Sequence, residues 1–252
     1  MIVPNPGTWD KLLLERGGDP VKSHDIGLLL KLVSLQKQEL RYPVGIPDGT
    51  AHSGVQEVLQ DVSKLPVSVY SARGLEAETG ISKSQINLSL NRCIDVGLAT
   101  KDRNLGIPRA NKKALYEFIV YGIRYVFPAK PGRLTRGVAT AFAAPVLRDK
   151  LMSAGDLQPV WPDAIGDIKG LEVEPLFKSA VFASRKDPEM YALLALVDAI
   201  RIGQARERNL ASDLLRQHLG LEAYKGRRSN DPISSRDIED ILNLVDGRDE
   251  LV

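Results

Sequence analysis

The 252-residue sequence predicts a mainly α-helical protein with a small β wing. Apolar residues recur every three or four positions in several segments, and this spacing places them on one face of a helix. Strand patterns are few and short. Residues 65–70 alternate between apolar and polar side chains, and residues 98–107 can form two short strands around a turn. Helical signals therefore dominate the chain.

The composition is typical of a soluble globular protein, with 43% hydrophobic and 26% charged residues. The length suits one large domain or two ordinary ones. Because the net charge is only +2, a nucleic-acid-binding function would depend on a local basic surface. The N-terminus lacks the residue order of a signal peptide, and no apolar run of about 18 residues occurs. We therefore expect a cytoplasmic protein without a membrane segment.

The residues that carry most catalytic and metal chemistry are scarce. One cysteine and three scattered histidines predict neither a disulfide nor a metal site, and we expect no cofactor. Cys93 lies on the apolar side of a predicted helix, which favours a buried structural thiol over a redox sensor. Gly-x-Gly-x-x-Gly, Walker A and Gly-x-Ser-x-Gly patterns do not occur. The sequence therefore predicts a protein that is not an enzyme.

Residues 70–98 hold the most informative pattern, two short helices joined by a tight turn. Helices are expected over residues 72–79 and 83–96, with Gly80 in the left-handed turn and Ser82 as the N-cap of the second helix. The buried stripe of the second helix would comprise Ile86, Leu90, Cys93 and Ile94. Its opposite face would carry Ser84, Gln85, Leu88, Asn91 and Arg92, with Lys83 and Asn87 at the margins. This arrangement predicts a helix-turn-helix, although a core helix pair with a polar outer face is the alternative.

The same stretch resembles the winged helix-turn-helix of MarR-like bacterial transcription regulators, over residues 24–125. The matching positions are Leu75, Gly80, Ile81, Ser82, Ile86, Leu90, Gly97 and Leu98. Glu76 departs from the family pattern, which has a small alanine four residues before the turn glycine. Either Ala77 takes that role after a rotation of the first helix, or the two helices lie further apart. The resemblance implies a dimer that binds paired half-sites on DNA.

A basic cluster follows the second helix. Residues 98–100 and Ile107 would form the two strands of an abbreviated wing, with a turn that ends at Gly106. The basic residues of this region are Lys101, Arg103, Arg109, Lys112 and Lys113. Beside a helix-turn-helix such residues suit phosphate contacts, which add affinity but no sequence information. A solvated loop is the alternative interpretation.

Helices are also expected on both sides of this region. The N-terminal part predicts helices over residues 9–16 and from 20 to about 40, and residues 54–62 can form another. An aromatic-rich helix over 111–127 would separate the first domain from the rest or lie in a dimer interface. The composition then changes, and an irregular segment over 156–177 would be anchored by Trp161. We expect domains over 1–127 and 128–252, the first a winged helix-turn-helix domain and the second helical.

The clearest C-terminal signal is a helix pair over residues 188–202 and 205–219. Its junction carries Arg201, Arg206 and Arg208, which would form ion pairs with Asp198 and Glu207 or, alternatively, bind an anion. A last helix would begin at Ser234 or Ser235. This end would dock back onto the protein or exchange with a second subunit.

These patterns predict a homodimeric, sequence-specific regulator of transcription, such as a repressor, that binds double-stranded DNA. The predicted DNA-contacting residues are Ser82, Lys83, Ser84, Gln85, Asn87, Asn91, Arg92, Lys101, Arg103, Arg109 and Lys112. Among them Arg92 would prefer guanine and the amide side chains adenine, while Lys83, Arg103 and Arg109 would bind phosphates. The alternative is an antitoxin-like or defence-associated interaction module, which binds the product of a neighbouring gene and represses its own operon.

Overall fold

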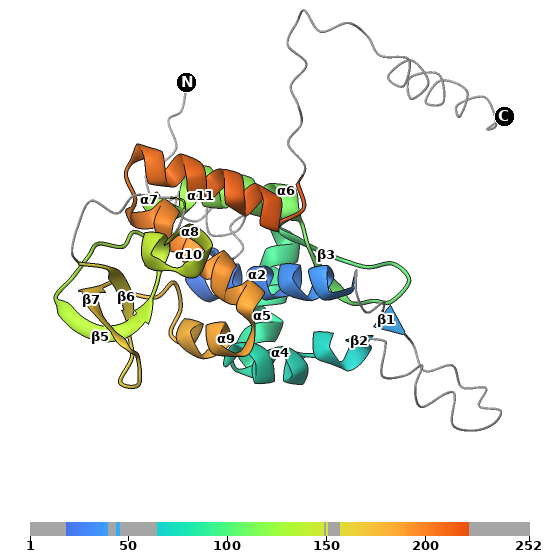
Figure 1. Cartoon of the computed structure of the whole chain (residues 1–252). Coiled ribbons are helices and arrows are strands. Elements are labelled where there is room, and N and C mark those ends of the chain that lie inside the picture. Colours follow the sequence, from blue (N-terminus) through green and yellow to red (C-terminus); the bar gives the residue numbers. More distant parts are fainter. Residues whose placement is uncertain (1–18, 40–43, 46–64, 149, 151–156, 222–252) are drawn as a thin grey trace, which may run out of the picture. The chain divides into compact units, whose positions relative to one another are not determined.

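The computed structural model of the chain describes residues 19–39, 44–45, 65–148, 150 and 157–221, and these form a mainly helical protein with small sheets (Figure 1). The predicted fold class is confirmed at this level. The helices expected over residues 9–16, over 54–62 and after Ser234 lie outside the described residues.

Three helices form the N-terminal part of the core: α2 (Ser23–Glu39), α4 (Ala72–Thr79) and α5 (Lys83–Asp95). Each of the three packs against the other two. The apolar residues of α2 are buried all round, which indicates that the helix has neighbours on every side. Two-residue strands β1 (Val44–Gly45) and β2 (Leu65–Pro66) pair in parallel between α2 and α4.

The strand expected over residues 65–70 is wrong beyond Pro66. The chain there turns into the short 3-10 helix η1 (Val67–Tyr70). Ser71 explains the turn, because its backbone N–H and its hydroxyl both donate to the Ser68 carbonyl. The same hydroxyl accepts a hydrogen bond from the Gly74 backbone and so begins α4.

The turn between α4 and α5 has the predicted glycine and the predicted N-cap residue, but the capping hydrogen bond comes from another side chain. Gly80 has φ of 68°, in the left-handed region where a side chain is strained. Ser82 is the N-cap residue of α5 as predicted, but its side chain makes no capping hydrogen bond, and its hydroxyl lies 3.3 Å from that of Ser84. Glu76 accepts a hydrogen bond from the Lys83 backbone N–H at 3.2 Å. The residue that departs from the family pattern therefore supplies a cap for the next helix.

A β hairpin and a long helix follow α5. Strands β3 (Ala99–Lys101) and β4 (Pro108–Ala110) pair antiparallel, and the Asp102 carboxylate accepts two backbone N–H groups in the turn between them. The chain then continues through α6 (Lys112–Glu117), the π-helical η2 (Phe118–Gly122) and α7 (Ile123–Val126). The helix expected over residues 111–127 is confirmed, with Asn111 as its N-cap.

The irregular segment expected over residues 156–177 instead forms two strands of a small barrel. Strands β5 (Leu134–Ala139), β6 (Pro159–Pro162) and β7 (Ile168–Glu172) each pair with the other two. Glycine permits this close approach: a Cβ at Gly137 would lie 1.9 Å from the Trp161 carbonyl oxygen, and one at Gly170 would lie 2.0 Å from that of Gln158. The anchoring role of Trp161 is confirmed, because its ring is fully buried and its indole N–H donates to Asp198 at 2.5 Å.

The remaining helices contact both the barrel and the first three helices. They are η3 (Ala141–Ala143), α8 (Pro145–Arg148), α9 (Ala180–Lys186), α10 (Pro188–Ile202) and α11 (Ala205–His218). The predicted helix pair is confirmed as α10 and α11. The ion-pair interpretation of the junction is confirmed for Arg201, which lies 2.6 Å from Asp198 and also donates to two backbone carbonyls.

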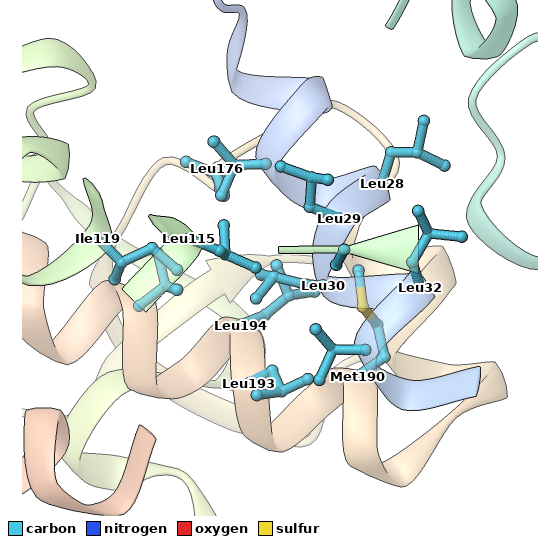
Figure 2. Packing of buried hydrophobic residues seen from close by; sticks show 14 of the residues in the cluster. Leu28, Leu29, Leu30, Leu32, Leu115, Ile119, Leu176, Met190, Leu193 and Leu194 are labelled. Carbon is cyan, nitrogen blue, oxygen red and sulfur yellow. The ribbon is translucent and has the colours of Figure 1, made fainter. Parts of the chain in front are cut away.

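One hydrophobic core runs through the described residues on both sides of the expected domain boundary. Figure 2 shows Leu30 of α2 beside Leu194 of α10 and Leu115 of α6, and Leu32 of α2 near Met190 of α10. The described residues from 19 to 221 belong to one compact unit. The chain therefore does not divide into separate units at residues 127 and 128, because helices from both halves bury the same apolar surface.

Candidate nucleic-acid interface

The outer face of α5 is exposed, as the predicted reading surface requires. Its buried side consists of Ile86, Ser89, Arg92 and Cys93, which face α2 and α4. The exposed residues at its start and along its outer face are Ser82, Lys83, Ser84, Gln85, Asn87, Leu88 and Asn91. These residues offer hydroxyls and amides that can both donate and accept hydrogen bonds. They form a single strip that starts at the N-terminus of the helix.

Arg92 does not belong to this strip, and its expected contact with guanine is wrong. Its side chain is only 5% exposed and lies against Asp25 of α2. The guanidinium donates to both carboxylate oxygens of Asp25, at 2.9 and 2.6 Å. Ser89 donates to the same carboxylate at 2.5 Å. By helical spacing Arg92 belongs to the polar face, about 40° from Leu88, but α2 packs over this position and removes it from solvent.

The charge on Asp25 depends on these donors. Burial alone would raise the pKa of this carboxyl, but hydrogen bonds from Arg92, from the Lys22 backbone and from Ser89 outweigh it and hold the pKa below its ordinary value. The neighbouring His24 has a lowered pKa, mainly because it is partly buried, although the charge of Asp25 and, to a smaller extent, a hydrogen bond with Gln85 oppose the shift. Gln85 therefore lies where the exposed strip of α5 meets the N-terminus of α2.

The β3–β4 hairpin holds basic residues of two kinds. Lys101 and Arg103 are exposed and so is Lys113, in the first turn of α6. Lys112 is partly buried, and burial, followed by repulsion from Arg109, lowers its pKa. The hairpin thus presents fewer free cations than its sequence indicated.

Arg109 is turned inwards, so its expected phosphate contact is wrong. One nitrogen of its guanidinium lies 2.7 and 2.6 Å from the two oxygens of Glu39, and another lies 3.4 Å from Asp102. The guanidinium also stacks over the ring of Tyr70, 5.5 Å from its centroid. Arg109 thereby joins the hairpin to the end of α2 and to η1.

Sequence reasoning missed the acidic partners of these arginines. Asp25 and Glu39 both lie on α2. Each is distant in the sequence from the arginine that it binds, which is Arg92 for Asp25 and Arg109 for Glu39. A signal was present for Asp25, because a carboxylate beside the apolar run 26–30 has to find a partner when the helix is buried. Glu39 lies at the end of its helix, where no such signal distinguishes it from a solvated residue.

The described part of residues 19–221 contains neither a candidate metal site nor a candidate membrane-spanning helix. These residues contain no group of three or more histidine, cysteine, aspartate or glutamate side chains placed to hold a metal ion. None of their helices combines the length and apolar character that crossing a bilayer requires. Cys93 is buried, and burial raises the pKa of its thiol to about 12, so it is protonated at neutral pH.

No model of a known protein family, no curated protein and no solved structure matches this chain. The resemblance to MarR-like regulators therefore stays a prediction.

Proposed function

We propose that this protein is a sequence-specific regulator of transcription that binds double-stranded DNA through a winged helix-turn-helix of the MarR-like kind. In this proposal α2, α4 and α5 are the three helices, α5 enters the major groove and the β3–β4 hairpin is the wing. The observation that carries the proposal is the exposed strip of hydroxyl and amide side chains over the first turns of α5. The N-terminal residues of a reading helix are the ones that reach base edges.

The charges around α5 suit a DNA backbone. Lys83, Lys101 and Arg103 are exposed and are assigned to phosphates. The backbone N–H groups of Leu105 and Asn104 hold the pKa of Asp102 below its ordinary value. Asp102 is the one acid of this hairpin, and its carboxylate is bound within the turn between β3 and β4. The N-terminus of α5 adds little positive charge of its own, because the Glu76 carboxylate already accepts the Lys83 backbone N–H there. Affinity would then be strongly salt-dependent.

The proposal includes a homodimer, because two reading helices related by a two-fold axis match the symmetry of paired half-sites. The helix through α6, η2 and α7 offers a surface for it. Tyr121 and Tyr125 are 71% and 77% exposed, and Val126 beside them is 50% exposed. Large apolar side chains gathered on one helix are typical of an interaction surface. The dimer would act on DNA in the cytoplasm.

The test begins with selection of duplexes from a random library by the full-length protein, because no target sequence is known. Binding to the selected duplex and to a scrambled one is then measured over a range of salt concentrations. We expect Arg103→Ala to weaken binding to both duplexes and to lower the salt slope by about one. We expect Asn91→Ala to lose mainly the preference for the selected duplex, by about 1–3 kcal/mol.

Lys169→Ala in β7 is the matched control, since Lys169 is exposed but lies on the barrel. It should leave the salt slope unchanged. Sedimentation of the complex should give two chains per selected duplex. Failure to enrich any sequence, or identical binding by all three variants, would contradict the proposal.

A further inference from the structure

Because the side chain of Arg92 is buried, the exposed face of α5 has no guanidinium. The helix contains two cations, Lys83 and Arg92. Arg92 is held by Asp25, and Lys83 occupies the first helical position, about 140° round the helix from Leu88 at 100° per residue. The exposed face therefore lacks the bidentate arginine contact to guanine, which is the commonest specific contact to DNA.

The side chains that remain favour adenine. Asn and Gln side chains make paired hydrogen bonds with the N6 and N7 atoms of adenine in the major groove. Gln85, Asn87 and Asn91 are exposed along α5, with Ser84 between them on the same face. A face with amides and no free arginine is suited to A·T base pairs.

Leu88 adds an apolar group to the same strip. Its side chain is 50% exposed, whereas the other apolar residues of α5 are buried or half-buried. Ser84 and Asn91 lie within about 60° of it round the helix. Thymine carries a C5 methyl group at the floor of the major groove, and an apolar side chain gains contact with it there. A G·C pair offers no such group.

Asp95 fixes the direction in which such a helix can enter the groove. It is exposed at the last position of α5 and lies about 20° from Leu88 round the helix. Its carboxylate would repel phosphates if the C-terminal end of the helix went deepest. Entry by the N-terminal end keeps Asp95 near the rim and brings Gln85 and Leu88 to the base edges.

We propose, on the basis of the proposed function, that α5 reads an A·T-rich half-site in which Leu88 contacts the methyl group of a thymine. The recognised chemistry is therefore an adenine edge next to a thymine methyl. Sequence choice then comes from amide hydrogen bonds and one apolar contact rather than from arginine and guanine.

The experiment uses the full-length protein and the duplex selected from the random library. A second duplex has uracil in place of each thymine of the selected core, which removes the methyl groups and leaves base pairing intact. We expect the unmodified protein to bind the uracil duplex about tenfold more weakly. Leu88→Ala should bind the thymine duplex about tenfold more weakly as well, and should show no further loss with uracil.

Val96→Ala is the matched control, because Val96 is also 50% exposed but lies just beyond the end of α5. It should keep the full response to uracil. A selected core rich in G·C pairs, or equal binding of thymine and uracil duplexes by the unmodified protein, would overturn the inference and leave DNA binding intact. If no duplex is enriched, both the inference and the proposed function fail. The response of the unmodified protein to uracil does not depend on how any variant folds.

Discussion

The pair formed by Arg92 and Asp25 is the residue-scale feature on which the packing of α5 against α2 depends. Both side chains are almost fully buried, and the guanidinium binds both carboxylate oxygens. A buried ion pair adds little net stability over apolar residues of the same size, but loss of one partner leaves an uncompensated buried charge. Arg92 is therefore expected to matter for folding rather than for DNA sequence.

Arg92→Ala should lower the free energy of unfolding by about 3–5 kcal/mol, because Asp25 stays buried without its guanidinium. Asn91→Ala, one residue earlier and exposed, should change it by less than about 0.5 kcal/mol. The double variant Asp25→Leu/Arg92→Met should recover most of the loss, since no charge is then buried. Urea denaturation of the four proteins measures these differences. Equal midpoints for Arg92→Ala and Asn91→Ala would show that the ion pair does not support the fold.

Helical spacing alone could not assign Arg92. The spacing gives the position of a side chain round its own helix, and it places Arg92 on the polar face, about 40° from Leu88. Which side is buried there depends on α2, whose Asp25 is 67 residues away in the sequence. The same limit applies to Arg109, whose partner Glu39 is 70 residues away. Ser84 and Asn91 were predictable because they lie inside the polar face where no other helix covers it.

At the scale of elements, a group of polar contacts at the N-terminus of α10 connects this helix to α2 and α4. Asp187 caps α10 by accepting the backbone N–H groups of Glu189 and Met190. Its carboxylate also accepts from Lys31 at 2.8 Å and from Ser34 at 2.5 Å. Lys31, fully buried on α2, reaches Glu78 of α4 as well, at 2.9 Å. Lys31 of α2 therefore binds carboxylates at α4 and at the start of α10, and so connects three helices.

Asp187→Ala should lower the free energy of unfolding by about 3–5 kcal/mol, because it removes a cap and leaves Lys31 with a single, half-exposed partner. Ser179→Ala is the control, since Ser179 precedes α9 but makes no side-chain cap hydrogen bond. It should cost less than about 1 kcal/mol. The comparison is made by urea denaturation at pH 7. A small effect of Asp187→Ala would contradict the role of Asp187 in connecting α10 to α2.

The pKa of Asp187 predicts how the stability lost in Asp187→Ala depends on pH. Burial would raise the pKa of Asp187, but hydrogen bonds from Lys31 and Ser34 outweigh it and hold the pKa below its ordinary value of 3.8. Its contribution is therefore complete above pH 3.8 and disappears as the pH falls through the lower value of the folded state. The difference between the unmodified protein and Asp187→Ala should shrink in that acid range.

Elements with local signals were predictable, and those built from distant pairing were not. Helices α4, α5, α10 and α11 follow from apolar spacing, caps and terminal glycines. The barrel does not, because each of its strands needs partners from elsewhere in the chain. Gly170 looks like a turn residue in the sequence. In the structure it lies in β7, where it lets the backbone of Gln158 come close.

At the scale of the whole molecule, the first domain expected from the sequence is only part of a core. α10 packs against α2, α7, α9 and α11, so apolar surface from both halves of the chain is buried on one helix. Asp198 of α10 also binds Trp161 of the barrel, Thr140 and Arg201. Sequence patterns located the helices but could not show that they share a core, because apolar spacing marks a buried face without naming its partner.

A fragment of residues 1–127 should therefore fail to unfold cooperatively. Without α10, the leucines of α2 that face it would be exposed, and Lys31 would lose Asp187. A fragment of residues 1–221 is the matched control, since the core residues lie between Ile26 and Leu219. Thermal unfolding followed by circular dichroism should give a sharp transition for 1–221 and a broad or absent one for 1–127. A sharp transition for the shorter fragment would mean that residues 1–127 fold alone and that the shared core is not required for them.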